Sequence, residues 1–317
     1  MATTNFKMKH PPPLYCNNEH FSMALNTYYQ HIGYPEILAK WTEEEFDSSV
    51  VNVLSKRLDD KLDDQPLRVL GVGSSEGNQE TLLLSKLKTK FSRISATVIE
   101  PNTKQLSVYQ DMVHQKSSDI TGIEYKWHNQ TFQEFVTSIE TGHKYHFITI
   151  VHAIYFVGEV EETVRKLYEF LEPGGIIFLV ALTDSGAGLL SKTFPHIAVE
   201  EQTPTNTTEP QKIKTNYLIT STDVKSVLSK YQMAYTQSSY TESADVTPCF
   251  NQVKMTPETK LLLDVITVTV KFQESVSDEI FNQVMDFIKR NSRVKKGDQG
   301  DDKYYFDSKC DILVISK

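Results

Sequence analysis

The sequence predicts an α/β fold built on a doubly wound parallel sheet. Two observations support this: short apolar runs alternate with helical segments between residues 67 and 182, and the first run ends in a glycine-rich loop. Strands that alternate with helices in this way form βαβ units, whose strands lie parallel in one sheet. Because open α/β sheets bind ligands at the carboxyl ends of their strands, we expect the binding site there.

Five strands are expected in this region. The first, "LRVLGVG", is a short apolar run that ends in glycines, as expected for a buried strand. The others lie in "SATVIE", "IEYKWHN", "YHFITIVHAIYFV" and "IIFLVAL". Helical segments separate them, and Asn102 is expected to cap the helix that follows the second strand. The segment "EVEETVRKLYEFLEPGG" is expected to be a helix with a glycine at its C-terminus.

The flanking segments are predicted to be mainly helical. "EHFSMALNTYYQHIGYPEILAKW" and "EEEFDSSVVNVLSKRL" precede the sheet, while "STDVKSVLSKY", "PETKLLLDVITVTV" and "SDEIFNQVMDFIKRN" follow it, before a final strand in "KCDILVISK". We divide the chain into a disordered leader (1–17) and one domain (18–317). Within the domain we expect an N-terminal helical lid (18–58), a cofactor-binding core (67–182) and a substrate lobe (183–317).

Composition narrows the function classes. The 317 residues carry a net charge of -8, which argues against a nucleic-acid substrate because such proteins usually present a basic face. Cys16, Cys249 and Cys310 are far apart and form no metal-binding motif, so we expect no metal and a reducing, cytoplasmic location. No apolar run reaches about 18 residues and no signal peptide is evident, so we expect no membrane-spanning segment. We also expect a monomer.

The loop after the first strand has a distinctive glycine spacing. Gly71, Gly73 and Gly77 form G-x-G-x-x-x-G, which differs from the G-x-G-x-x-G of pyrophosphate-binding dehydrogenases. Small residues there let backbone amides and a helix N-terminus approach a polar ligand. The altered spacing favours a cofactor without a pyrophosphate. The structural alternative is a tight strand-to-helix turn with no ligand.

An acidic residue ends the second strand. Glu100 closes "VIE", and a carboxylate at this place can accept hydrogen bonds from both hydroxyls of a ribose. The alternative is a solvated glutamate that caps the next helix. Together with the glycine loop, Glu100 favours a site for an adenosyl group.

Five stretches of this chain resemble a known family. They are "RVLGVGSSEG", "TVIEPNTKQLSVYQDMV", "YKWHNQT", "HFITIVHAIYFV" and "YLITSTDV", and the resemblance runs in order from about Phe21 to the terminal "DILVISK". The chain is similar to the class I S-adenosylmethionine-dependent methyltransferases, and more closely to the histamine N-methyltransferase family. The resemblance implies a Rossmann-like, mostly parallel seven-stranded sheet with an accessory substrate-binding lobe. It also implies S-adenosylmethionine as cofactor and a small amine or imidazole as methyl acceptor.

The same resemblance implies which residues hold the cofactor. Glu100 would bind the ribose with Gln105 beside it, residues 131 and 132 would bracket the adenine, and residue 151 would lie at the methionine end. The family has a serine at position 132, so Phe132 is left a backbone or stacking role. The implied cofactor residues are Gly73, Glu100, Gln105, Thr131, Phe132 and Val151.

At the acceptor end this chain departs from the family pattern. Tyr34 replaces a glutamate that takes the substrate amine, His152 replaces a glutamine that orients the imidazole, and Ser308 lies nearest to a substrate-contacting asparagine. Two tryptophans that wall the family's pocket fall at Ala187 and Ser191. The resemblance therefore indicates methyl transfer more strongly than it indicates histamine as the substrate.

Methyl transfer from a sulfonium needs an acceptor lone pair held in line with the methyl carbon, which is catalysis by proximity and orientation. His152 follows the fourth strand directly, so it is the expected proton acceptor or ring-orienting residue. The alternative is a histidine packed under the loop. Tyr155 and Phe156 are expected to wall the sulfonium, since aromatic faces attract cations.

Two other functions remain open from the sequence. One is a nicotinamide-dependent oxidoreductase on a similar sheet, against which the glycine spacing and "IEPNTKQ" argue. The other is a protein that binds the cofactor but has lost its acceptor pocket.

Overall fold

The computed structural model describes most of the chain. The described residues are 14, 17–58, 62, 65–115, 121–139, 142–195, 197, 219–251 and 255–317. Most of the predicted leader lies outside them. The chain divides into two compact units. We call residues 33–183, 219–241 and 309–317 the sheet unit, and residues 1–32, 184–218 and 242–308 the helical unit.

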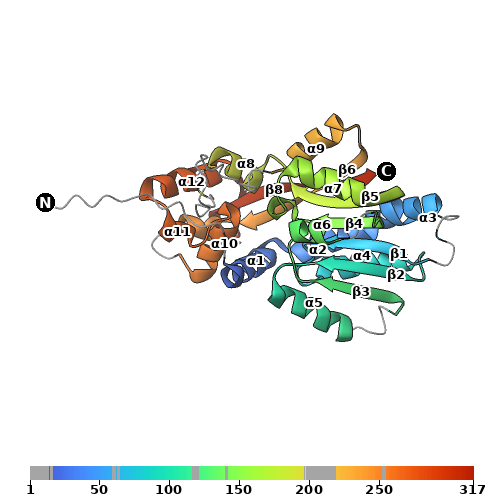
Figure 1. Cartoon of the computed structure of the whole chain (residues 1–317). Helices are drawn as coiled ribbons and strands as arrows, with labels where there is room; N and C mark the ends of the chain where they lie inside the picture. Colours follow the sequence, from blue (N-terminus) through green and yellow to red (C-terminus); the bar gives the residue numbers. More distant parts are fainter. Residues whose placement is uncertain are drawn as a thin grey trace, which may run out of the picture. The chain divides into compact units, whose positions relative to one another are not determined.

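The sheet has the predicted α/β architecture. Its strand order is β3-β2-β1-β4-β5-β8-β6, so the strand order reverses beside β1 (Figure 1). The pairs β1–β2, β1–β4, β2–β3 and β4–β5 are parallel, and β5–β8 is antiparallel. The short β7 pairs only with β8 and lies off this path. The bounds are β1 Leu67–Val72, β2 Ile94–Ile99, β3 Ile123–His128, β4 Tyr145–Val151, β5 Leu171–Leu182, β6 Ala234–Asp245, β7 Arg293–Lys296 and β8 Asp302–Ser316.

Helices pack on both faces of the sheet unit because its central strands are apolar on both sides. Phe147 and Phe178 pack against Phe46, which precedes the sheet in sequence. Their neighbours Ile148 and Ile177 face the opposite side, since successive side chains of a strand alternate. The helices of this unit are α2 Tyr34–Trp41, η2 Thr42–Val51, α3 Asn52–Leu58, α4 Asn78–Lys88, α5 Thr103–Gln115, α6 Phe132–Ser138, η3 Ile154–Phe156, α7 Val160–Phe170 and α9 Ser221–Lys230.

Two local predictions in the sheet unit need correction. The helix expected to end at a glycine stops earlier, because α7 ends at Phe170 and β5 begins at Leu171. Pro173 favours this ending, since the residue before a proline is driven to extended backbone. The helix expected from residue 43 is π-helical over Thr42–Val51 and becomes regular only in α3.

The helical unit contains α1 Asn18–Ile32, α8 Gly186–Thr193, η5 Thr247–Phe250, α10 Pro257–Thr267, α11 Phe272–Ser275 and α12 Asp278–Arg290. The expected helix "PETKLLLDVITVTV" therefore ends earlier than predicted, and Val268 takes a left-handed φ of 53°. The expected lid falls into both units, since its first helix belongs to the helical unit and α2 to α3 belong to the sheet unit. Within the described residues, no helix is both long enough and apolar enough to span a bilayer.

Candidate functional site

The loop after β1 requires a glycine at position 73. Gly73 has a φ of 66°, which L side chains rarely adopt, and its amide donates to the Ile99 carbonyl over 2.9 Å. A Cβ at this position would lie 2.6 Å from the Cβ of Ala153, next to the end of β4. The loop therefore passes directly over the ends of its neighbouring strands β2 and β4.

The other two glycines make room for buried side chains. A Cβ on Gly77 would lie 2.2 Å from the ring of Tyr109, and one on Gly71 would lie 2.0 Å from a carboxyl oxygen of Glu80. The sequence suggested that both glycines open the backbone to a ligand. In the structure they let Tyr109 and Glu80 pack against the loop.

Glu100 lies at the carboxyl end of β2 and is buried, with 5% of its surface exposed. Its two carboxyl oxygens accept backbone hydrogen bonds, Oε2 from the Ser75 amide and Oε1 from the Asn102 amide, both over 2.8 Å. Burial raises the pKa of Glu100, and these two hydrogen bonds partly oppose the rise. Glu100 is therefore not a solvated helix cap. Each oxygen keeps a second lone pair for a further donor, such as a hydroxyl.

Gln105 lies one turn beyond Glu100 and is buried. The Oδ1 of Asn102 accepts from the amides of Lys104 and Gln105 over 3.0 and 3.3 Å, which confirms the predicted N-terminal cap of α5. The cap fixes the start of this helix beside Glu100. The structure therefore brings Gly73, Glu100 and Gln105 to one place.

Thr131 and Phe132 stand at the start of α6, after β3. Thr131 forms a capping box with Glu134, and the Phe132 side chain is buried. Just before them, the Nδ2 of Asn129 donates to the carbonyls of Glu100 and Pro101 over 3.0 Å each. These bonds tie the end of β3 to the end of β2. The two predicted adenine-site residues thus follow a loop fixed to Glu100.

His152 follows Val151, the last residue of β4, and has a left-handed φ of 50°. Its Nε2 is 2.8 Å from the Tyr240 hydroxyl, and its Nδ1 is 3.3 Å from the Tyr155 hydroxyl. Left-handed backbone is uncommon outside glycine and is found often at functional sites. The ring is half-buried between two phenols, so the simple core-packing alternative does not describe it.

Tyr155 is held in place from the opposite side. Its hydroxyl accepts the Leu182 amide at the end of β5 over 2.5 Å, so its proton can be donated to the Nδ1 of His152. When Tyr155 donates this proton, the imidazole proton lies on Nε2 and faces the Tyr240 hydroxyl; in the other tautomer Nε2 accepts from Tyr240. Phe156 is 39% exposed. The aromatic residues predicted to wall the methyl group therefore lie at the carboxyl end of β4, with Tyr155 oriented by backbone.

The remaining predicted acceptor residues lie mostly in the helical unit. Ser308 is buried, and its Oγ accepts the amide of Ala187 over 3.0 Å at the start of α8. The Oγ of Ser191 donates to the Ala187 carbonyl over 3.1 Å. Ser308 and Ala187 therefore join β8 to the start of α8, while the Ser191 bond lies within α8. Tyr34 lies in α2, and its side chain falls outside the described part.

Sequence reasoning missed two residues that complete these contacts. Tyr240 lies on β6, a polar strand that showed no apolar pattern, and it reaches His152 from 88 positions away. Glu80 lies in the first turn of α4. Acidic residues are common at this position because the positive end of the helix dipole stabilises their charge. The available signal for Glu80 was Gly71, a glycine inside a buried strand, which often marks a close approach.

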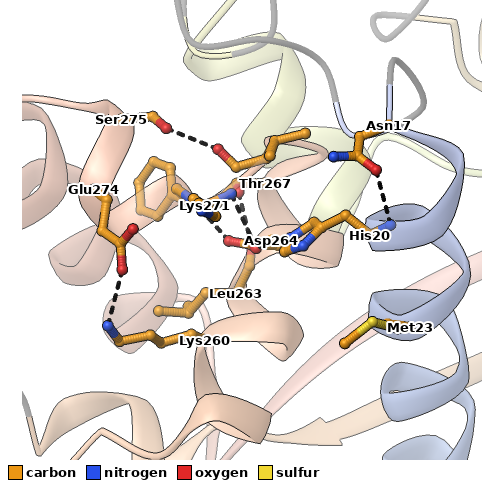
Figure 2. Close-up of polar contacts among 12 residues, drawn as sticks. Asn17, His20, Met23, Lys260, Leu263, Asp264, Thr267, Lys271, Glu274 and Ser275 are labelled. Atoms are coloured by element: carbon orange, nitrogen blue, oxygen red, sulfur yellow. Dashed lines mark hydrogen bonds and ion pairs between the residues drawn. The ribbon is translucent and has the colours of Figure 1, made fainter.

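The helical unit has a cavity of its own, of about 200 Å³, beside α1, α10 and α11. Figure 2 shows the ring of His20 directed at the carboxyl of Asp264, with Nε2 and Oδ2 2.6 Å apart. Asp264 is buried and also accepts the amides of Lys271 and Phe272 over 3.0 and 2.8 Å. These bonds hold the turn between α10 and α11 and attach it to α1.

Comparison with known proteins assigns the family. Residues 40–235 match a family model described as a methyltransferase domain, which covers more than half of the chain. This chain belongs to that methyltransferase family. It is an S-adenosylmethionine-dependent methyltransferase, and the matched region spans β1 to β5 with all the predicted cofactor residues.

Named relatives are more distant. The methyltransferase is 26% identical to histamine N-methyltransferase B of Xenopus laevis, over 80% of this chain and 82% of that protein. It is 25% identical to carnosine N-methyltransferase 2 of Gallus gallus, over 65% of this chain and 61% of that protein. Among solved structures it is similar to the YcgJ protein of Bacillus subtilis, with a TM-score of 0.47 and 12% identity over 84% of this chain and 97% of that one.

Proposed function

We propose that this methyltransferase transfers a methyl group to a nitrogen of a small imidazole or amine. The observation that carries the proposal is the position of His152. Its backbone is left-handed at the end of β4, and its ring lies between the hydroxyls of Tyr155 and Tyr240. Its neighbour Ala153 abuts Gly73, so this polar group adjoins the cofactor loop. A polar group there suits an acceptor that must be oriented through hydrogen bonds.

The cofactor half of the proposal uses the residues around Glu100. The carboxylate retains lone pairs for the two ribose hydroxyls, while its bonds to the Ser75 and Asn102 amides fix its orientation. Gln105 would bind beside it, and the start of α6 would flank the adenine. Val151 would lie at the methionine end. S-adenosylmethionine supplies an activated methyl group when it is bound.

The acceptor half concerns proton handling at His152. Methylation of a neutral nitrogen that carries a hydrogen leaves an extra proton on the product. A neutral imidazole has one lone pair, so His152 can accept that proton only after it gives up its bond from Tyr155 or Tyr240. If the substrate needs no proton removal, the same ring would orient it through a hydrogen bond. Accepting the proton requires a neutral His152 at the start of turnover, whereas orienting the substrate requires only a hydrogen bond.

Two features support the acceptor class. Relatives over most of the chain are named for histamine and carnosine, both of which contain an imidazole. The changed residues at positions 34, 152 and 308 argue that histamine itself is a poor acceptor here. A small imidazole or amine that differs from histamine fits both facts.

The test is a methylation screen with isotopically labelled S-adenosylmethionine against imidazoles, imidazole dipeptides and small amines. We expect at least one imidazole or amine acceptor to be turned over, and histamine to be turned over poorly. We expect His152→Ala to lower kcat on the best acceptor by about 10²-fold, within the usual range for acid–base groups, and to leave cofactor affinity unchanged. His152→Gln, which keeps a hydrogen-bonding side chain, should retain more activity on an acceptor that needs no proton removal.

Two results would contradict the proposal. One is full activity of His152→Ala on the best acceptor. The other is cofactor binding without methylation of any acceptor in the screen, which would favour a non-catalytic binding protein.

A further inference from the structure

Glu80 is a buried carboxyl group that the proposed mechanism does not use. It lies in the first turn of α4 and is 4% exposed. Its carboxyl fills the space that a side chain on Gly71 would need. Ser74, on the glycine loop, donates to its Oε2 over 2.5 Å, and the Tyr109 hydroxyl lies 3.4 Å from Oε1. Glu80 therefore lies directly against the loop proposed to hold the cofactor.

Among the residues that the structure describes, no cation acts on the pKa of Glu80. The groups that affect its pKa are Ser74, Tyr109 and Glu100, of which Glu100 is itself an acid. Tyr125 on β3 is a further titratable group near Glu80, and burial together with the charge of Glu80 raises the pKa of its hydroxyl. Among the described residues, none forms an ion pair with Glu80. Burying an acid that has hydrogen bonds but no ion-pair partner is costly once the acid ionises, so its position at a ligand loop points to a function.

We propose that Glu80 makes the loop select the charged methyl donor over its neutral product. S-adenosylmethionine carries a sulfonium and an ammonium against one carboxylate, and so is a net cation. S-adenosylhomocysteine has lost the sulfonium charge and is neutral overall. A carboxylate beneath the loop attracts the first more strongly, because buried charges are poorly screened. Glu80 thus favours binding of donor and release of product.

This role makes donor affinity depend on pH. Burial raises the pKa of Glu80 to about 7, so near neutrality the group is partly protonated. A bound cation favours the carboxylate, and binding of the donor then releases a proton. Donor affinity should therefore rise with pH through neutrality, while product affinity should show a smaller rise. The inference rests on the cofactor of the family and is independent of the proposed acceptor.

The experiment is isothermal titration calorimetry of the full chain with each of the two ligands between pH 6 and pH 8. We expect donor affinity to rise about fivefold more than product affinity over this range. Glu80→Gln keeps the volume and an acceptor for Ser74 but has no charge. It should remove this excess rise and lower the donor-to-product affinity ratio at pH 8 by about tenfold. Comparison at each pH cancels titration of the ligands themselves. Glu124→Gln, an exposed change on β3, is the matched control and should behave as wild type.

Ser74→Ala keeps the test decisive even if Glu80→Gln does not fold. The Ser74 hydrogen bond lowers the pKa of Glu80, so its loss should move the midpoint of the donor profile to higher pH. An unchanged donor-to-product ratio in Glu80→Gln, or an unmoved midpoint in Ser74→Ala, would overturn the inference. Neither titration uses a methyl acceptor, so an error in the proposed substrate class would leave both results intact.

Discussion

At the scale of single residues, the candidate site depends on buried acidic side chains that accept hydrogen bonds from the glycine loop. Glu100 accepts the amides of Ser75 and Asn102, and Glu80 accepts the hydroxyl of Ser74. The glycine loop is thus bonded to an acid on either side. An acid that binds both the loop and a ligand affects stability and affinity together, so a substitution must be assayed for each.

Glu100→Ala tests this double role. Removing the carboxylate leaves the half-buried Ser75 amide and the buried Asn102 amide without this acceptor, so we expect the free energy of unfolding to fall by about 2–4 kcal/mol. Cofactor affinity should fall by at least tenfold, because the ribose hydroxyls would also lose their acceptor. Urea unfolding and calorimetric titration with S-adenosylmethionine measure the two effects. Glu124→Ala, exposed on β3, should change unfolding by less than about 0.5 kcal/mol. Unchanged cofactor affinity in Glu100→Ala would remove Glu100 from the site.

At the scale of elements, the junctions between strands and helices set the site. Gly77 is the N-cap residue of α4 and has a left-handed φ of 77°, and the fully buried ring of Tyr109 from α5 packs against this glycine. The start of α4 and the side of α5 are therefore locked together directly behind the loop. A side chain at this junction should disturb the loop more than it disturbs either helix.

Gly77→Ala should therefore cost more than backbone strain alone. Left-handed backbone costs about 1–2 kcal/mol for an alanine, and the clash with Tyr109 should add about 1–3 kcal/mol. Gly142→Ala is the matched control, since Gly142 has a φ of 94° but no atom within 4 Å of an added Cβ. Urea unfolding of the two variants separates packing from backbone strain. Equal losses of unfolding free energy in both variants would show that the Tyr109 ring moves aside without an energetic cost.

The sequence predicted the fold best where burial requires a recognisable pattern of apolar residues. The strands β1, β2, β4 and β5 were predicted because helices cover both faces and only apolar runs fit there. The edge strand β3 is only partly buried and instead alternates apolar and polar residues. By contrast, β6 lies at the sheet edge, is largely polar and was missed, and Tyr240 was missed with it. Glu100 was located from its place after β2. Its bonds to Ser75 and Asn102 depend on the folded backbone, which residue spacing does not specify.

At the scale of the whole molecule, several acids are buried with a raised pKa. Burial is the main cause for Glu80, Glu100 and Asp264, of which the last lies in the helical unit. Such groups oppose folding once they must ionise, because the folded chain holds their protons more tightly than the unfolded chain does. These three groups should therefore make the free protein more stable on the acidic side of neutrality than on the basic side.

Glu80 should dominate this dependence in the sheet unit. Its pKa is about 7 in the folded chain and near 4.5 in the unfolded chain, so its contribution is complete below pH 4.5 and is lost as pH rises through 7. The full difference is about 3 kcal/mol. Urea unfolding of the free protein at pH 5.5 and pH 8 should show wild type losing stability with rising pH, and Glu80→Gln losing about 2 kcal/mol less. Saturating S-adenosylmethionine should reduce the loss in wild type, since a ligand that binds the folded chain with ionised Glu80 stabilises it most at high pH. If Glu80→Gln loses as much stability with rising pH as wild type does, then Glu80 ionises at little cost and the loop accommodates its charge without a cation.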